Sequence, residues 1–88
     1  MPNYVIERVI PGASELTDDQ VNSLAKKSLG KMQELGIQWL HSYVTDDKVY
    51  CIYWAPDAEV IQRHANEIDI PANRIAAVKR LMGPATAD

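Results

Sequence analysis

The sequence predicts an α+β fold with the order β-α-β-β-α-β, in which two helices cover one face of a four-stranded antiparallel sheet. Three observations lead to this prediction. The chain has 88 residues, which suits a single domain over residues 1–88. Runs of β-branched and aromatic residues alternate with two segments whose apolar residues recur at helical spacing. Proline, glycine and aspartate separate the segments.

The first half of the pattern is a strand followed by a long helix. Residues 3–10, NYVIERVI, have strand composition, and Pro11-Gly12 ends the run. Thr17, with a glutamine three positions later, has the spacing of a capping box. Gly36 is suited to a left-handed C-cap. These signals predict a helix over residues 18–35.

A hairpin follows. Residues 37–45 and 48–55 are strand-like, and Asp46-Asp47 lies between them as a short turn. Because side chains alternate along a strand, a two-residue turn pairs Trp39 with Trp54 and divides the hairpin into two faces. We expect the helices to cover the more aliphatic face, which consists of Leu40, Ser42, Val44, Val49, Cys51 and Tyr53.

The second half ends with a helix and a strand. Asp57 can cap a helix that Pro71 ends, and residues 74–82, RIAAVKRLM, form the last predicted strand before Gly83-Pro84. With right-handed crossovers, the six elements give the ferredoxin-like split β-α-β arrangement.

One face of this sheet has no helix to cover it. It is predicted to carry Trp39, His41, Tyr43, Tyr50, Ile52 and Trp54. An exposed patch with four aromatic residues is unusual for a monomer. The simplest way to bury it is a second copy of the chain, so we expect a homodimer through this face.

The net charge indicates which classes of binding partner to exclude, and the cysteine content indicates the cellular compartment. The chain has 9 lysine and arginine residues against 12 acidic ones, a net charge of -3, which argues against nucleic acid and membrane partners. Cys51 is the only cysteine, so we expect a reducing compartment, the cytoplasm. Glu7 and Arg8 interrupt the first apolar run, which does not fit a signal peptide.

His41 is the strongest functional candidate, because imidazole is a common metal ligand and acid/base group. The alternative is an interface histidine bonded to a neighbouring tyrosine. Glu7 lies near His41 if it shares the open face; otherwise Arg8 occupies that face. The simpler expectation for Glu7 is an ion pair with Arg8, Lys79 or Arg80.

His64 and Cys51 have plainer expected roles. His64 lies beside the apolar stripe of the second helix, so we expect a helix-edge residue, with metal binding as the alternative. Cys51 is expected under the helices as a buried, unreactive thiol. The sequence contains no C-x-x-C, H-E-x-x-H, phosphate-loop or G-x-S-x-G motif, so no catalytic motif predicts an enzyme.

Taken together, several short motifs resemble a small bacterial family, formerly a domain of unknown function and now labelled a nickel-binding protein family. They are Tyr4, Glu7-Arg8, Pro11-Gly12, Trp39, Ser42-Tyr43-Val44, Asp46-Asp47-Lys48, Cys51, Ala55-Pro56-Asp57, Pro71-Ala72 and Arg74-Ile75. The resemblance covers residues 3–82 and implies a ferredoxin-like fold, dimeric association and, in some members, nickel bound through imidazole and oxygen groups. His41 and His64 match imidazole positions of that pattern, whereas Gln38 stands where nickel-binding members have another histidine.

Two functions therefore compete. The first is a cytoplasmic homodimer that binds a divalent transition metal, nickel, through His41 with Glu7 and His64 as further ligands, and that is a binder rather than an enzyme. The second is a small-molecule binder or cofactor-free enzyme of the dimeric α/β-barrel type. Its pocket would lie on the open face at Tyr43 and Tyr50. A purely structural module is a third, simpler possibility.

Overall fold

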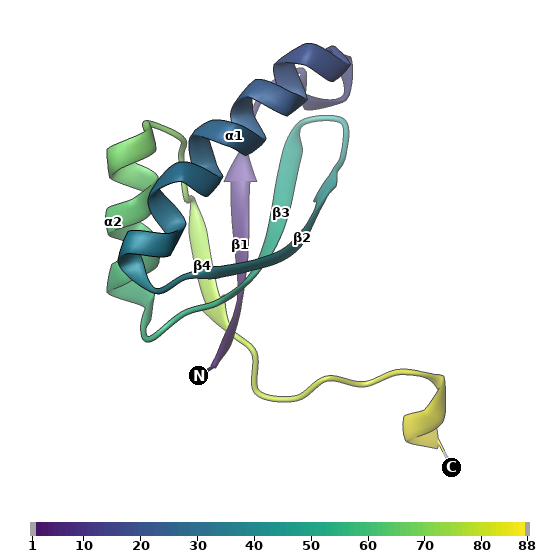
Figure 1. The fold of residues 1–88 in the computed structure, drawn as a ribbon. Helices are drawn as coiled ribbons and strands as arrows, with labels where there is room; N and C mark the ends of the chain where they lie inside the picture. The colour runs from purple at the N-terminus through teal and green to yellow at the C-terminus, as the bar shows by residue number, and fades with distance from the viewer. Residues whose placement is uncertain (1, 88) are drawn as a thin grey trace.

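Residues 2–87 are described by a computed structural model and have the predicted β-α-β-β-α-β order (Figure 1). The strands are β1 (Asn3–Val9), β2 (Gln38–Val44), β3 (Lys48–Trp54) and β4 (Arg74–Ala77). The helices are α1 (Asp18–Leu35) and α2 (Ala58–Ile68), and two short 3-10 helices are η1 (Ala13–Glu15) and η2 (Pro84–Ala87).

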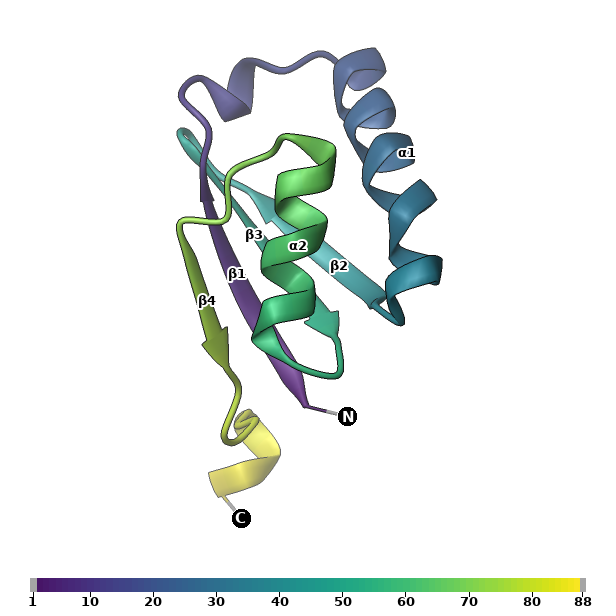
Figure 2. The ribbon, with the colours of Figure 1, turned by 90° about the vertical axis from the view of Figure 1, so that its left-hand side faces the viewer.

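The strands form one antiparallel sheet in the order β2-β3-β1-β4. Both helices lie on the same side of it, with α2 in front of the middle strands and α1 toward the β2 edge (Figure 2). The predicted ferredoxin-like α+β class is thus confirmed. Within residues 2–87, no helix covers the other side of the sheet.

The helix ends follow the predicted capping signals. The Thr17 hydroxyl accepts a hydrogen bond from the Gln20 backbone N–H at 3.2 Å, and the Gln20 side chain accepts one from the Thr17 N–H at 2.9 Å. Gly36 ends α1 with φ 71°, and Asp57 caps α2. Asp69 ends α2 in the left-handed region, φ 55°. Within residues 2–87, neither helix is both long and apolar enough to cross a membrane.

The β2–β3 hairpin departs from the predicted register at Leu40. From the turn as far as His41, the residues pair as predicted. Leu40 then has no partner on β3 and forms a β-bulge. Trp39 consequently pairs with Tyr53 instead of Trp54. The predicted placement of Trp39 on the open face and of Leu40 under the helices is therefore wrong.

Burial of the indole accounts for the bulge. Trp39 packs against the core on the helix side, and its Nε1–H donates to the Ser42 hydroxyl at 2.9 Å. A partly buried indole N–H is usually paired with such an acceptor. Leu40, in exchange, is exposed. The large aromatic surface is thus buried at the expense of a smaller aliphatic one.

The last strand is shorter than the predicted 74–82. β4 ends at Ala77, and the Val78 N–H donates to the Asn3 carbonyl at 2.8 Å. Since β1 begins at Asn3, residues beyond Val78 have no strand beside them to pair with. The chain then leads away from the sheet (Figure 1).

The core lies between the sheet and the helices. Its largest fully buried side chains are Ile6, Met32, Tyr53, Ile61, His64 and Ile68. In β1 the buried positions alternate with half-buried ones, so Tyr4, Ile6 and Arg8 face the helices. Glu7 therefore faces the open side, which settles the question that the sequence left open.

Candidate functional site

The open face of the sheet keeps five of the six residues predicted for it. They are His41, Tyr43, Tyr50, Ile52 and Trp54. Tyr43 and Trp54 are 60% and 39% exposed, and His41 is exposed as well. The His41 and Tyr43 rings meet edge to face, with centroids 5.1 Å apart. In one protomer, the His41 imidazole thus lies among aromatic rings and is accessible to a ligand or to a second protein chain.

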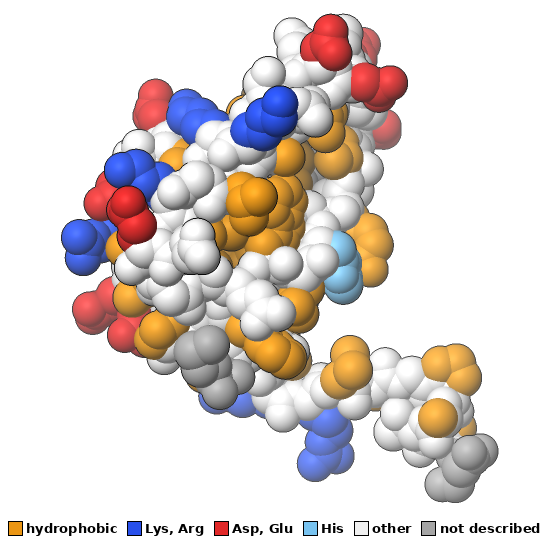
Figure 3. Space-filling model, viewed as in Figure 1, with side chains coloured by type: hydrophobic (Ala, Val, Ile, Leu, Met, Phe, Trp, Pro, Cys, Tyr) orange, Lys and Arg blue, Asp and Glu red, His pale blue; other side chains and the backbone are white. Residues whose placement is uncertain are grey.

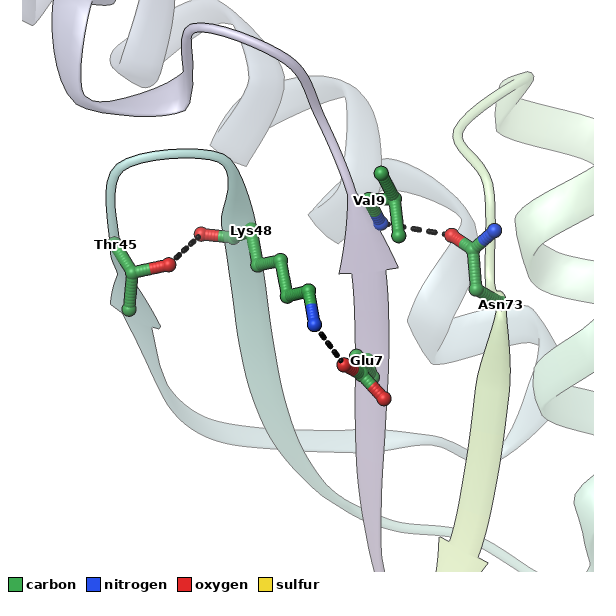
Figure 4. Close-up of polar contacts among 5 residues, drawn as sticks. All are labelled: Glu7, Val9, Thr45, Lys48 and Asn73. Atoms are coloured by element: carbon green, nitrogen blue, oxygen red, sulfur yellow. Dashed lines mark hydrogen bonds and ion pairs between the residues drawn. The ribbon is translucent and has the colours of Figure 1, made fainter.

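Glu7 shares the open face but has a different partner from those expected. Its Oε1 lies 2.8 Å from Lys48 Nζ, in an ion pair between β1 and the start of β3 (Figure 4). The hydrogen bond and charge of Glu7 raise the pKa of Lys48. The expected ion pair with Arg8, Lys79 or Arg80 is wrong. The strand register brings the Glu7 carboxylate to Lys48.

Glu7 and His41 do not meet within one chain. They stand on β1 and β2, and β3 lies between those strands. Adjacent strands are about 4.8 Å apart, so the two backbones are separated by roughly 10 Å. In this arrangement the Glu7 carboxylate is held by Lys48, and within residues 2–87 no cluster of metal-ligating side chains joins it to His41.

His64 lies on the opposite side of the sheet. It is fully buried, so the expectation of a helix-edge residue is wrong. Its Nε2 is 2.9 Å from the Ser28 carbonyl oxygen, an acceptor, which assigns the proton to Nε2. Burial lowers the pKa of His64, the Ser28 bond partly opposes this, and the Arg8 charge lowers it further. His64 therefore cannot share an ion with His41 in the same chain.

No three histidine, cysteine, aspartate or glutamate residues gather into a possible metal cluster within residues 2–87. The donor set of one protomer on the open face is therefore a single exposed imidazole with tyrosine hydroxyls nearby. A transition-metal site normally needs three or four ligands. The residues of one chain do not make such a site by themselves.

A family model described as nickel responsive protein, SCO4226-like, matches residues 4–78. The chain belongs to the SCO4226-like family. The crystal structure of SCO4226 from Streptomyces coelicolor A3(2) superposes with a TM-score of 0.80 at 18% identity, over 91% of this chain and 99% of that one. That likeness shows the shared fold. No curated protein matches the sequence.

In this member of the SCO4226-like family, Cys51 lies where it was predicted. It is a free thiol on the helix side, opposite Ser42, and only 5% exposed. Tyr43 and Tyr50, also predicted for the open face, stand directly opposite each other there. The predicted faces are therefore correct from the turn as far as the bulge.

The sequence left open which face Arg8 occupies, and the structure buries it on the helix side, 3% exposed. Its guanidinium donates to the Pro71 carbonyl at 3.0 Å and to the Tyr53 hydroxyl at 3.1 Å. The signal was present in the sequence, because Arg8 alternates with Tyr4 and Ile6, the two residues of β1 that anchor the core. A charged residue in that phase belongs to the interior and needs partners.

Proposed function

We propose that the protein is a nickel-binding homodimer whose metal lies between the open faces of two copies, with His41 as the principal ligand. The family description, nickel responsive, supports nickel as the metal. The exposed imidazole of His41 supports the position, since neutral imidazole suits nickel.

The requirement for two copies follows from the ligand count. One protomer offers one imidazole on this face, and Glu7 is held in its pair with Lys48. A two-fold axis presents the same residue twice. Two copies of His41, with Glu7 of either copy released toward the ion, would enlarge the donor set beyond that of a single chain.

Calorimetry with nickel tests the ligand. The protein is purified without a histidine tag, and wild type is compared with His41→Ala. We expect His41→Ala to lose at least about tenfold in affinity, since even indirect support of a metal ligand has effects of that size. A wild type that binds no nickel, or a His41→Ala variant that binds as well, refutes the proposal.

A gain of affinity offers a second test at Gln38. The bulge places Gln38 and His41 on the same face although they are three residues apart, because Gln38 pairs with Trp54 and His41 with Ile52. Gln38→His should therefore add an imidazole beside His41 and tighten nickel binding. Gln62→His, on the exposed side of α2, is the matched control and should change nothing.

Sedimentation tests the dimer. Trp54 is a large, half-exposed residue of the aromatic patch. Trp54→Glu would force a charge into a buried interface and should shift the protein toward monomer. Lys26→Glu, on the exposed side of α1, is the control for a charge change alone. A wild type that sediments as a monomer at micromolar concentration refutes the homodimer.

A second function is binding of a small molecule on the same face. The observation in its favour is the cross-strand pair Tyr43 and Tyr50, with the His41 ring against Tyr43. These side chains could donate and accept hydrogen bonds around a ligand enclosed by two sheets. This function becomes the leading one if the wild type fails to bind nickel.

A further inference from the structure

A cavity of about 100 Å³ lies on the other side of the sheet, beneath α1. Leu24 and Ala25 of α1 line one wall, and Trp39 and Val49 line the floor. Figure 3 shows apolar side chains exposed in a hollow next to α1, so the cavity opens to solvent. It is separate from the open face and takes no part in the function proposed above.

Polar groups are few in this cavity, but they are of one kind. Arg8, Ser28, Ser42 and Tyr53 line it, and all four side chains carry hydrogen-bond donors. The Tyr53 hydroxyl accepts a bond from Arg8, and the Ser42 hydroxyl accepts one from Trp39. Within residues 2–87, the Ser42 hydroxyl accepts from Trp39, and the Tyr53 hydroxyl also interacts with the Ser28 side chain. The Ser42 proton is thus available to an acceptor that enters the cavity, and the Tyr53 hydroxyl can rotate to turn its proton toward the same acceptor.

Arg8 adds a positive charge without an acidic partner. Among residues 2–87 no carboxylate lies within 4.0 Å of its guanidinium. Its hydrogen bonds go to the Ile70 and Pro71 carbonyls and to Tyr53, and with a further interaction with the Cys51 side chain they leave one of its five N–H groups unused. The two carbonyls follow the C-terminal end of α2, so backbone dipoles alone offset the charge. A buried cation in this state favours the approach of an anion.

We propose that the cavity binds a small amphipathic carboxylate, a short-chain alkanoic acid. Its hydrocarbon part would lie against Leu24, Ala25 and Val49, and its carboxylate would accept hydrogen bonds at the Arg8–Tyr53 end. Size limits the ligand, because an apolar cavity of about 150 Å³ admits benzene. A chain of a few carbon atoms fits inside, and a longer one would extend through the opening.

Calorimetry with hexanoate and hexanol separates charge recognition from apolar binding. We expect hexanoate to bind at least about tenfold more tightly than hexanol, because hydrogen bonds to a charged acceptor are about twice as strong as neutral ones. Labelling of Cys51 gives an independent signal. Its thiol lines the same cavity, so hexanoate should slow its reaction with a small thiol reagent.

Variants locate the site. Tyr53→Phe keeps the ring and should weaken hexanoate several-fold while leaving hexanol unchanged. Ala25→Leu fills the cavity and should abolish binding of both, whereas Gln33→Leu, on the exposed side of α1, should abolish neither. The proposal fails if hexanoate does not bind, if hexanol binds equally well, or if Ala25→Leu binds hexanoate like the wild type.

Discussion

His64 should make the fold sensitive to mild acid. The imidazole is fully buried with its proton on Nε2, and its Nδ1 has no hydrogen-bond partner within residues 2–87. Protonation would place a charge in the core near the Arg8 guanidinium, and the Ser28 hydrogen bond and the Glu67 charge only partly oppose the effect of burial. The native state therefore favours the neutral ring, and its pKa is lowered from the ordinary 6.5.

The size of the pH effect on stability follows from the linkage between proton binding at His64 and folding. Below pH 6.5 the unfolded chain binds a proton at His64 that the native chain does not, so stability falls as the pH falls. The slope is at most about 1.4 kcal/mol per pH unit, which limits the loss between pH 7.5 and 5.5 to about 1.4 kcal/mol. A chain of this length has a total stability of about 4–13 kcal/mol, so the loss is measurable.

Urea unfolding at pH 7.5, 6.5 and 5.5 measures this slope. His64→Leu removes the titrating group, and the Ser28 carbonyl keeps its helical partner in α1, so the variant should lose the slope that His64 contributes. His41→Gln controls for the other histidine. Equal slopes in wild type and His64→Leu would refute the reasoning. If His64→Leu does not fold, an NMR titration of the native His64 ring gives the same answer, and a pKa at or above 6.5 refutes it.

The remaining predictions concern single contacts. Thr17→Ala removes the capping box of α1 and should cost about 1 kcal/mol of unfolding free energy, measured by urea denaturation. Asn73→Ala removes the 2.7 Å hydrogen bond that the Val9 N–H donates to the Asn73 side chain (Figure 4). The same assay should show a loss of about 1 kcal/mol of unfolding free energy, and no loss would mean that water replaces the bond. Burial raises the pKa of Tyr53 to about 12, so an ultraviolet titration of wild type minus Tyr53→Phe should show its phenol ionising only there. Cys51 should react slowly with thiol reagents in the native protein and quickly in denaturant; fast native labelling would contradict its burial.

The parts of the fold that were predicted correctly depend on local signals. Thr17 and Gly36 define α1 because capping is decided by residues within one helical turn. The Asp46-Asp47 turn fixes the hairpin register for the same reason. Nothing near Leu40 marks a bulge, because no glycine or proline interrupts the strand there. The bulge depends on burial of Trp39, a tertiary effect that the sequence does not display.

The candidate site was harder to predict because its contacts are between distant segments. The Glu7–Lys48 pair depends on the register of β1 against β3. The burial of His64 depends on α1, which brings the Ser28 carbonyl over it. Periodicity places His64 near the apolar stripe of its helix but does not reveal which neighbouring element closes over it. Sequence alone could therefore name His41, Glu7 and His64 but could not tell that the sheet separates His64 from the other two, or that Lys48 holds Glu7.

The bulge at Leu40 also determines how this strand can change in length during evolution. Deleting Leu40 would restore simple alternation and would leave Trp39 toward the helices and Gln38 toward the open face, because Leu40 is the extra residue that interrupts the alternation. One deleted codon would thus remove the bulge without moving any other side chain of the strand to the opposite face. Relatives that lack the extra residue must be aligned with their gap at position 40. A gap placed on the other side of Trp39 would equate side chains that lie on opposite faces of the sheet.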